Sequence, residues 1–117
     1  MSGSMTDWLD IGNIADIPVR GARTIQLAGR EEIAVFRTGD EQVFALVNRC
    51  PHKHGHLSQG IVHGHAVACP LHNWRISLAT GEALGGDQGC TPTIAVRIEA
   101  DRILLSRSAM LATTIAA

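Results

Sequence analysis

The sequence is poor in several features, and each shortage excludes a class of protein. It has only three cysteines in 117 residues, and a low, odd count argues against a disulfide-stabilised secreted scaffold. Ten Lys and Arg residues face eleven Asp and Glu with no basic stripe, so nucleic acid is not an expected partner. No apolar run is as long as a membrane span and no leader segment opens the chain, so we expect a cytoplasmic protein without membrane association.

Helical periodicity is also missing, since no window longer than about eight residues keeps it. Turn signals instead separate short apolar runs, at Thr38-Gly39-Asp40, Thr80-Gly81-Glu82 and Ala100-Asp101. We expect strands over residues 6–11, 19–27, 31–37, 42–47, 65–69, 74–79, 93–99 and 102–107. The pattern predicts an all-β fold, an antiparallel sandwich or a partly open barrel.

The length predicts one domain with a modest core that needs no disulfides. The first four residues are interpreted as a cloning remnant before a natural start at Met5, and the domain is expected over 5–107. Residues 48–74 interrupt the strand pattern and are expected to form a small subdomain that presents two loops. Residues 108–117 are expected to be a frayed C-terminal tail.

All six histidines fall between positions 52 and 72, close to two of the cysteines. The pattern is Cys50-x-His52, then sixteen residues, then Cys69-x-x-His72. Each loop therefore offers one thiolate and one imidazole. A mixed-ligand [2Fe–2S] cluster needs two thiolates on one iron and two imidazoles on the other, which is the set that two such loops supply.

A zinc site built from the same four residues is the main alternative. Zinc sites usually space cysteines as C-x2–4-C and histidines as H-x3–5-H, whereas here the two types alternate. The single residue between Cys50 and His52 strains chelation of one ion and suits a bridge across two irons.

The ligand type also affects the redox potential. Neutral imidazoles leave the cluster less negative than four thiolates would, which raises its potential into a range of roughly −150 to +300 mV.

The two loops with their flanks, Cys50-Pro51-His52-Lys53-His54-Gly55-His56-Leu57-Ser58-Gln59-Gly60 and Cys69-Pro70-Leu71-His72-Asn73-Trp74, resemble the two boxes of Rieske proteins. They are most similar to the small subunit of bacterial assimilatory NAD(P)H-dependent nitrite reductase. Four further stretches also resemble that family, namely residues 32–40, 60–67, 80–85 and 89–90. The resemblance covers roughly positions 7 to 106.

The resemblance implies one [2Fe–2S] cluster held by Cys50, His52, Cys69 and His72. It also implies a partner, the large subunit, which carries FAD, siroheme and a [4Fe–4S] cluster and reduces nitrite to ammonium with NAD(P)H. Some family members lack the cluster ligands, whereas this chain keeps all four. No catalytic constellation stands apart from these loops, so the chemistry is expected on the large subunit. The alternatives are a free-standing Rieske ferredoxin for an aromatic-ring dioxygenase, and a structural subunit whose site is empty or zinc-filled.

The remaining residues near the loops receive more modest roles. His54, His56, His63 and His65 are expected at the surface, and Cys90 is expected to be a small core or loop residue. Trp74 is expected to pack beneath the cluster. Residues 85–92 are either a loop that shields the cluster or an ordinary connector. Asn73-Trp74 stands where high-potential Rieske proteins place a serine donor, which favours a potential near the low end of the range.

Overall fold

The computed structural model describes residues 8–26, 31–50, 56–70, 74–84 and 89–106. Ten strands and two short 3-10 helices follow one another in this part of the chain. The strands are β1 (Trp8–Asn13), β2 (Gly21–Ile25), β3 (Ile33–Arg37), β4 (Val43–Val47), β5 (Ile61–His63), β6 (Ala66–Ala68), β7 (Arg75–Ser77), β8 (Thr93–Ile94), β9 (Val96–Glu99) and β10 (Arg102–Ser106). The 3-10 helices are η1 (Ile14–Asp16) and η2 (Leu57–Gln59).

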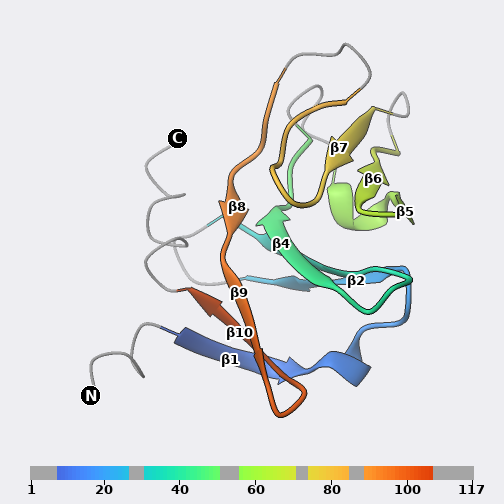
Figure 1. Ribbon diagram of the computed structural model, residues 1–117. Helices are drawn as coiled ribbons and strands as arrows, with labels where there is room; N and C mark the ends of the chain where they lie inside the picture. Colours follow the sequence, from blue (N-terminus) through green and yellow to red (C-terminus); the bar gives the residue numbers. More distant parts are fainter. Residues whose placement is uncertain (1–7, 27–30, 51–55, 71–73, 85–88, 107–117) are drawn as a thin grey trace.

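The strands form three antiparallel sheets arranged as layers (Figure 1). The first sheet has the order β1-β10-β9, the second β2-β3-β4-β8 and the third β5-β6-β7. The second sheet lies between the other two, and the sheets are not closed into a barrel. The all-β prediction is confirmed, and of its two forms the structure is the layered one.

The middle sheet is buried on both faces, and strand β3 shows why. Its run Ile33-Ala34-Val35-Phe36 is fully buried, although neighbouring side chains of a strand point to opposite faces. Ile33 and Val35 contribute to one apolar core, and Ala34 and Phe36 to another. A continuous apolar run is the pattern of a strand covered on both sides.

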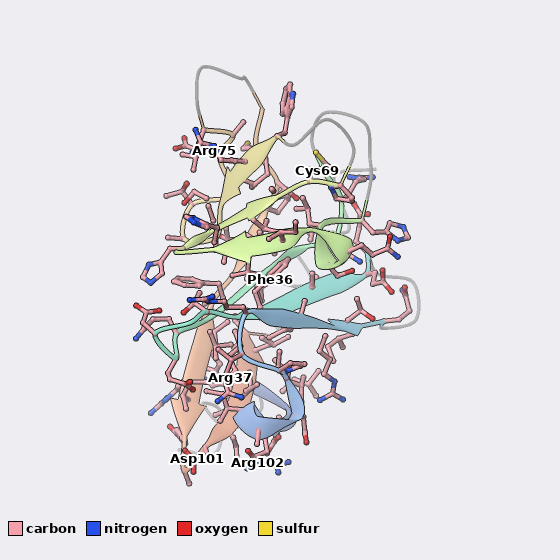
Figure 2. The ribbon with its side chains drawn as sticks, turned by 90° about the vertical axis from the view of Figure 1, so that its right-hand side faces the viewer. Phe36, Arg37, Cys69, Arg75, Asp101 and Arg102 are labelled. Carbon is pink, nitrogen blue, oxygen red and sulfur yellow. The ribbon has the colours of Figure 1, made fainter. Side chains whose placement is uncertain are left out.

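The two cores therefore divide the molecule. The first core joins the β1-β10-β9 sheet to the middle sheet, through side chains that include Ile17, Val47, Ile103 and Leu105. The second core joins the middle sheet to the β5-β6-β7 sheet, and it contains Cys50 and Cys69. In Figure 2 Cys69 and Arg75 lie at one end of the molecule and Asp101 and Arg102 at the other, with Phe36 between them.

The expected turns are present, but one expected strand is divided. Ala100 and Asp101 adopt positive φ angles of 49° and 66°, the backbone of a tight hairpin turn between β9 and β10. The apolar run 93–99 is split at Ala95, because its first half pairs with β4 and its second half with β10. Hydrophobic pattern alone cannot show such a change of partner.

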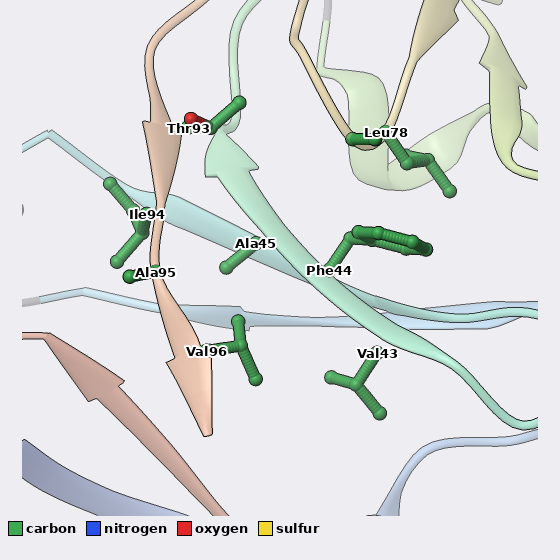
Figure 3. Close-up of a pocket in the computed structure, with 9 residues that line it drawn as sticks. Val43, Phe44, Ala45, Leu78, Thr93, Ile94, Ala95 and Val96 are labelled. Atoms are coloured by element: carbon green, nitrogen blue, oxygen red, sulfur yellow. The ribbon is translucent and has the colours of Figure 1, made fainter. Parts of the chain in front are cut away.

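A cavity of about 440 Å³, lined mostly by residues with apolar side chains, lies near this division (Figure 3). Its lining comes from β4, from the turn after β7 and from the β8–β9 segment. The lining residues are Val43, Phe44, Ala45, Leu78, Ala79, Thr93, Ile94, Ala95 and Val96. None of these has an ionisable side chain, so the cavity offers no metal ligand.

Candidate functional site

The two candidate thiolate ligands each lie just beyond the end of a strand. Cys50 follows β4 after two residues, and Cys69 directly follows β6. Their exposed fractions are 0% and 1%, both belong to the second core, and neither is in a disulfide. His52 and His72 lie outside the described residues, so their positions relative to the two thiols stay a prediction.

The second loop is closed at its base by a backbone hydrogen bond. The Cys69 N–H donates to the carbonyl oxygen of Trp74 at 2.6 Å, across the segment that contains His72. Trp74 is half-buried and packs against the second core, and its expected place beneath the cluster stays a prediction. The sulfur-bearing end of the loop is thereby fixed to the start of β7.

The first loop is closed by a side chain. Asn48 Oδ1 accepts a hydrogen bond from the Ser58 N–H at 2.8 Å, across the segment that contains His52. Asn48 is only 5% exposed, and its Nδ2 donates to Glu32 Oε1 at 2.7 Å. The Asn48 N–H also donates to the Glu32 carbonyl at 2.8 Å.

The two loops are then joined through Gly60, the residue after η2. A methyl group added at Gly60 would lie 2.1 Å from the carbonyl oxygen of Ala68, the residue before Cys69. Only glycine permits this approach. The end of the first loop therefore rests directly against the strand that leads into the second.

An ion pair lies beside the Cys50 segment. Arg49 Nη2 contacts Glu31 Oε2 at 2.8 Å, with side-chain exposures of 38% and 25%. A pair this exposed is screened by water, so we expect it to contribute little to stability.

One of the exposed histidines, His65, makes a contact between two sheets. His56, His63 and His65 are exposed, as the sequence predicts, and His54 lies outside the described residues. His65 Nε2 contacts Asp40 Oδ2 at 2.9 Å, and its ring centroid lies 5.3 Å from that of Phe44. Hydrogen bonds from the Thr38 hydroxyl and from His65 lower the pKa of Asp40 below its usual value.

Cys90 differs from Cys50 and Cys69 in its exposure to solvent. It is exposed and forms an isolated β-bridge with Glu82, in keeping with the prediction of a loop residue. Residues 85–88 of the proposed shielding loop lie outside the described part of the chain. The role of that loop therefore stays open between shield and connector.

The donor chemistry of the described part of the site fits an iron–sulfur cluster. Two buried thiols within one apolar core, neither in a disulfide, would supply the sulfur half of a mixed-ligand set in a setting shielded from water. Within the described ranges no group of three or more His, Cys, Asp or Glu side chains is gathered. The imidazole half of the predicted set belongs to the segments 51–55 and 71–73, outside those ranges.

Sequence reasoning found the cysteines but missed Asn48 and Gly60. Each acts through contacts with residues that are seven or more positions away in the sequence. Neither residue type is unusual in a loop, so the sequence carries no signal for their contacts.

The helices of the described chain include none long and apolar enough to cross a membrane.

Comparison with known proteins points to a single family. The model of the Rieske [2Fe–2S] domain matches residues 7–95. The ferredoxin component of a naphthalene 1,2-dioxygenase/salicylate 5-hydroxylase system from Ralstonia is 33% identical over 105 residues, covering 85% of this chain and 94% of that protein. The ferredoxin subunit of anthranilate 1,2-dioxygenase from Burkholderia cepacia is 38% identical over 78 residues, covering 67% and 70%.

Solved structures with the same fold include proteins of another system. A protein described as the small subunit of an NADH-dependent nitrite reductase from Mycobacterium tuberculosis superposes with a TM-score of 0.76 at 23% identity, covering 86% of this chain and 94% of that chain. The E. coli protein NirD superposes with a TM-score of 0.72 at 29% identity, covering 84% and 94%. With the family model matching most of its length, this chain belongs to the Rieske [2Fe–2S] domain family and is an electron-transfer protein with one such cluster.

Proposed function

We propose that this chain is the electron-transferring small subunit of an assimilatory NAD(P)H-dependent nitrite reductase, with its cluster held by Cys50, His52, Cys69 and His72. The ligand assignment is supported by the burial of both thiols in one core, each at the start of a loop that contains a histidine. A bound Rieske cluster supplies one-electron oxidation and reduction at a single centre. The apolar core excludes water from the thiolates, and the histidine side is where we expect a partner to approach.

The ligand assignment is tested by electron paramagnetic resonance of the dithionite-reduced protein. We expect a Rieske-type signal that is lost in His52→Ala and in Cys69→Ser, because each change removes one of the four ligands. Cys90→Ser is the matched control, since Cys90 is exposed and paired with Glu82, and it should keep the signal. A signal that survives in Cys69→Ser contradicts the assignment, and a zinc-filled protein without any signal supports the structural-subunit alternative.

The nitrite reductase assignment rests on sequence stretches beyond the two boxes. Residues 80–85 and 89–90 both resemble that family, and in the fold Glu82 and Ala83 pair with residues 89–90. The Ala83 N–H donates to the Gly89 carbonyl at 2.9 Å, and Glu82 bridges to Cys90. The Leu84 N–H donates to the Arg75 carbonyl at 2.8 Å, which places this pair of segments against β7. The 29% identity with NirD supports the same assignment.

This proposal implies a partner and a cellular location. The partner is a large subunit with FAD, siroheme and a [4Fe–4S] cluster, on which nitrite is reduced to ammonium, and the complex is cytoplasmic.

A second candidate function also has support. In this function the chain is a free-standing ferredoxin that passes electrons to an aromatic-ring dioxygenase. The observation in its favour is the 33% identity to a dioxygenase ferredoxin component along 94% of that protein.

Reconstitution separates the two functions. The cluster-loaded chain is mixed with a siroheme-containing large subunit, or with a Rieske-type oxygenase and its reductase. We expect co-elution with the siroheme protein in size-exclusion chromatography and a higher rate of nitrite-dependent NAD(P)H oxidation. Product formation by the oxygenase, with no complex on the siroheme side, would establish the ferredoxin function instead.

A further inference from the structure

Asn48 is a buried polar side chain that lies two residues before Cys50 and satisfies its hydrogen bonds on two different segments of the chain. Its Nδ2 donates to the Glu32 carboxylate at 2.7 Å, and its Oδ1 accepts from the Ser58 N–H at 2.8 Å. At 5% exposure, these bonds have little competition from water.

The orientation of the Asn48 amide is fixed by its partners. A backbone N–H can only donate, so Ser58 must face the amide oxygen. An ionised carboxylate can only accept, so Glu32 must face the amide nitrogen. Aspartate at this position would offer oxygens to both partners and would place two carboxylates in contact.

These bonds connect the segments that carry the proposed sulfur ligands. Glu32 precedes β3, Asn48 leads into Cys50, and Ser58 belongs to η2. From η2 the chain reaches Gly60, whose backbone lies against the Ala68 carbonyl beside Cys69. A shift of the Asn48 amide therefore moves the base of the first loop relative to the strand that holds the second thiol.

We propose that Asn48 is a positioning residue for the cluster, which sets the placement of the Cys50 segment against the Cys69 segment through Glu32 and Ser58. The inference rests on the proposed role of Cys50 as a ligand. Residues that orient metal ligands commonly change metal retention by about 10–100-fold when they are altered. Besides its contribution to folding, Asn48 is thus expected to affect the rate of iron release and the geometry of the ligands around the iron.

The test uses an isosteric exchange of the hydrogen bond. Asn48→Asp removes the donor to Glu32, whereas Asn48→Asp combined with Glu32→Gln restores one N–H donor between the same positions with reversed polarity. The full chain is loaded with iron and sulfide, iron release to ferrozine is timed, and the reduced protein is examined by electron paramagnetic resonance. Thermal unfolding of the iron-free proteins reports folding separately.

We expect Asn48→Asp to release iron about tenfold faster with a shifted signal, and the double variant to recover both properties. Glu31→Gln, which weakens the neighbouring ion pair with Arg49, should leave both unchanged. Wild-type behaviour of Asn48→Asp overturns the inference, as does an equal effect of Glu31→Gln. If Asn48→Asp does not fold, recovery in the double variant supports the inference and failure to recover overturns it.

Cys50→Ser separates this inference from the ligand assignment. Loss of the signal in Cys50→Ser, with no effect of Asn48→Asp, removes the role of Asn48 and leaves the ligand set intact. An unchanged signal in Cys50→Ser overturns the ligand assignment and the positioning role together.

Discussion

Gly60 is a position at which one added carbon atom would separate the two cluster loops. Its φ of −82° is open to any residue, so the requirement for glycine is steric and not conformational. A Cβ there would meet the Ala68 carbonyl oxygen at 2.1 Å and a Val67 methyl at 3.0 Å. Backbone cannot move away as a flexible side chain can, so the strand before Cys69 would have to shift.

Gly60→Ala is expected to destabilise the iron-free protein by about 1–3 kcal/mol, the usual cost of overpacking a tight site. It should also accelerate iron release, because the displaced strand leads directly into Cys69. Denaturant unfolding and the ferrozine assay measure the two effects.

Gly64→Ala is the matched control for this prediction. Gly64 has open space around its Cβ position but a φ of +59°, so alanine there meets strain alone, at a cost of about 1–2 kcal/mol. Iron release should stay at the wild-type rate in Gly64→Ala. Equal acceleration in both variants would show that the contact between Gly60 and Ala68 has no special bearing on the site.

At the scale of elements, a surface contact links the turn between β3 and β4 to the start of β6. Asp40, in that turn, accepts hydrogen bonds from the Thr38 hydroxyl and from His65, and these lower its pKa. Thr38 is fully buried and its Oγ1 also accepts from the Gln42 N–H at 3.0 Å, so the turn holds the carboxylate in place. The contact joins the middle sheet to the sheet that bears Cys69.

Asp40→Asn is expected to lower the free energy of unfolding near neutral pH, because it removes the charge and keeps the shape. A carboxyl whose folded-state pKa is lowered stabilises the protein above its ordinary pKa of about 3.9, and this contribution disappears as the pH falls through the folded-state value. The difference between the wild type and the variant should therefore shrink below about pH 4. Denaturant titrations at several pH values measure it.

Asp101→Asn is a suitable control, since Asp101 is exposed in the β9–β10 turn at the far end of the molecule. It should show no comparable difference that fades on acidification. A constant difference between wild type and Asp40→Asn from pH 7 to pH 3 would mean that the carboxylate charge does not stabilise the fold.

Local sequence predicted those features of the elements that depend on neighbouring residues. Apolar runs located β3 and β4 nearly to their ends, and the glycine of Thr80-Gly81-Glu82 marked a turn where φ is +78°. The division of 93–99 between two sheets depends on partners at positions 45–46 and 102–105, which periodicity does not encode. The layering follows from β3 facing two cores, and the contacts of Asn48 and Gly60 arise only once these layers exist.

At the scale of the whole molecule, the redox potential is expected at the low end of the Rieske range, towards about −150 mV. High-potential Rieske proteins place a serine donor after the second loop, where this sequence has Asn73-Trp74. With fewer donors to the cluster sulfurs, more negative charge stays on the cluster and an added electron is held less tightly. A redox titration of the loaded protein measures the potential, and a midpoint above zero would contradict the expectation.

The two cores give the molecule two parts that can be weakened separately. Ile76 lies in the core that contains both thiols and Ile103 in the other, and each is 0% exposed. Ile→Val removes one methyl group from either core, at a cost of about 0.5–1.5 kcal/mol. Because Ile76 pairs across β6 and β7 with Val67, two residues before Cys69, its loss should loosen the sulfur-bearing segment directly.

We therefore expect Ile76→Val and Ile103→Val to lower the unfolding free energy by similar amounts while only Ile76→Val accelerates iron release. Local opening near the site needs the second core alone, since regions of one fold open with different free energies. Denaturant unfolding and the ferrozine assay on both variants make the comparison. If iron release rises equally in the two, release proceeds through global unfolding, and the layer that holds Cys50 and Cys69 has no stability of its own.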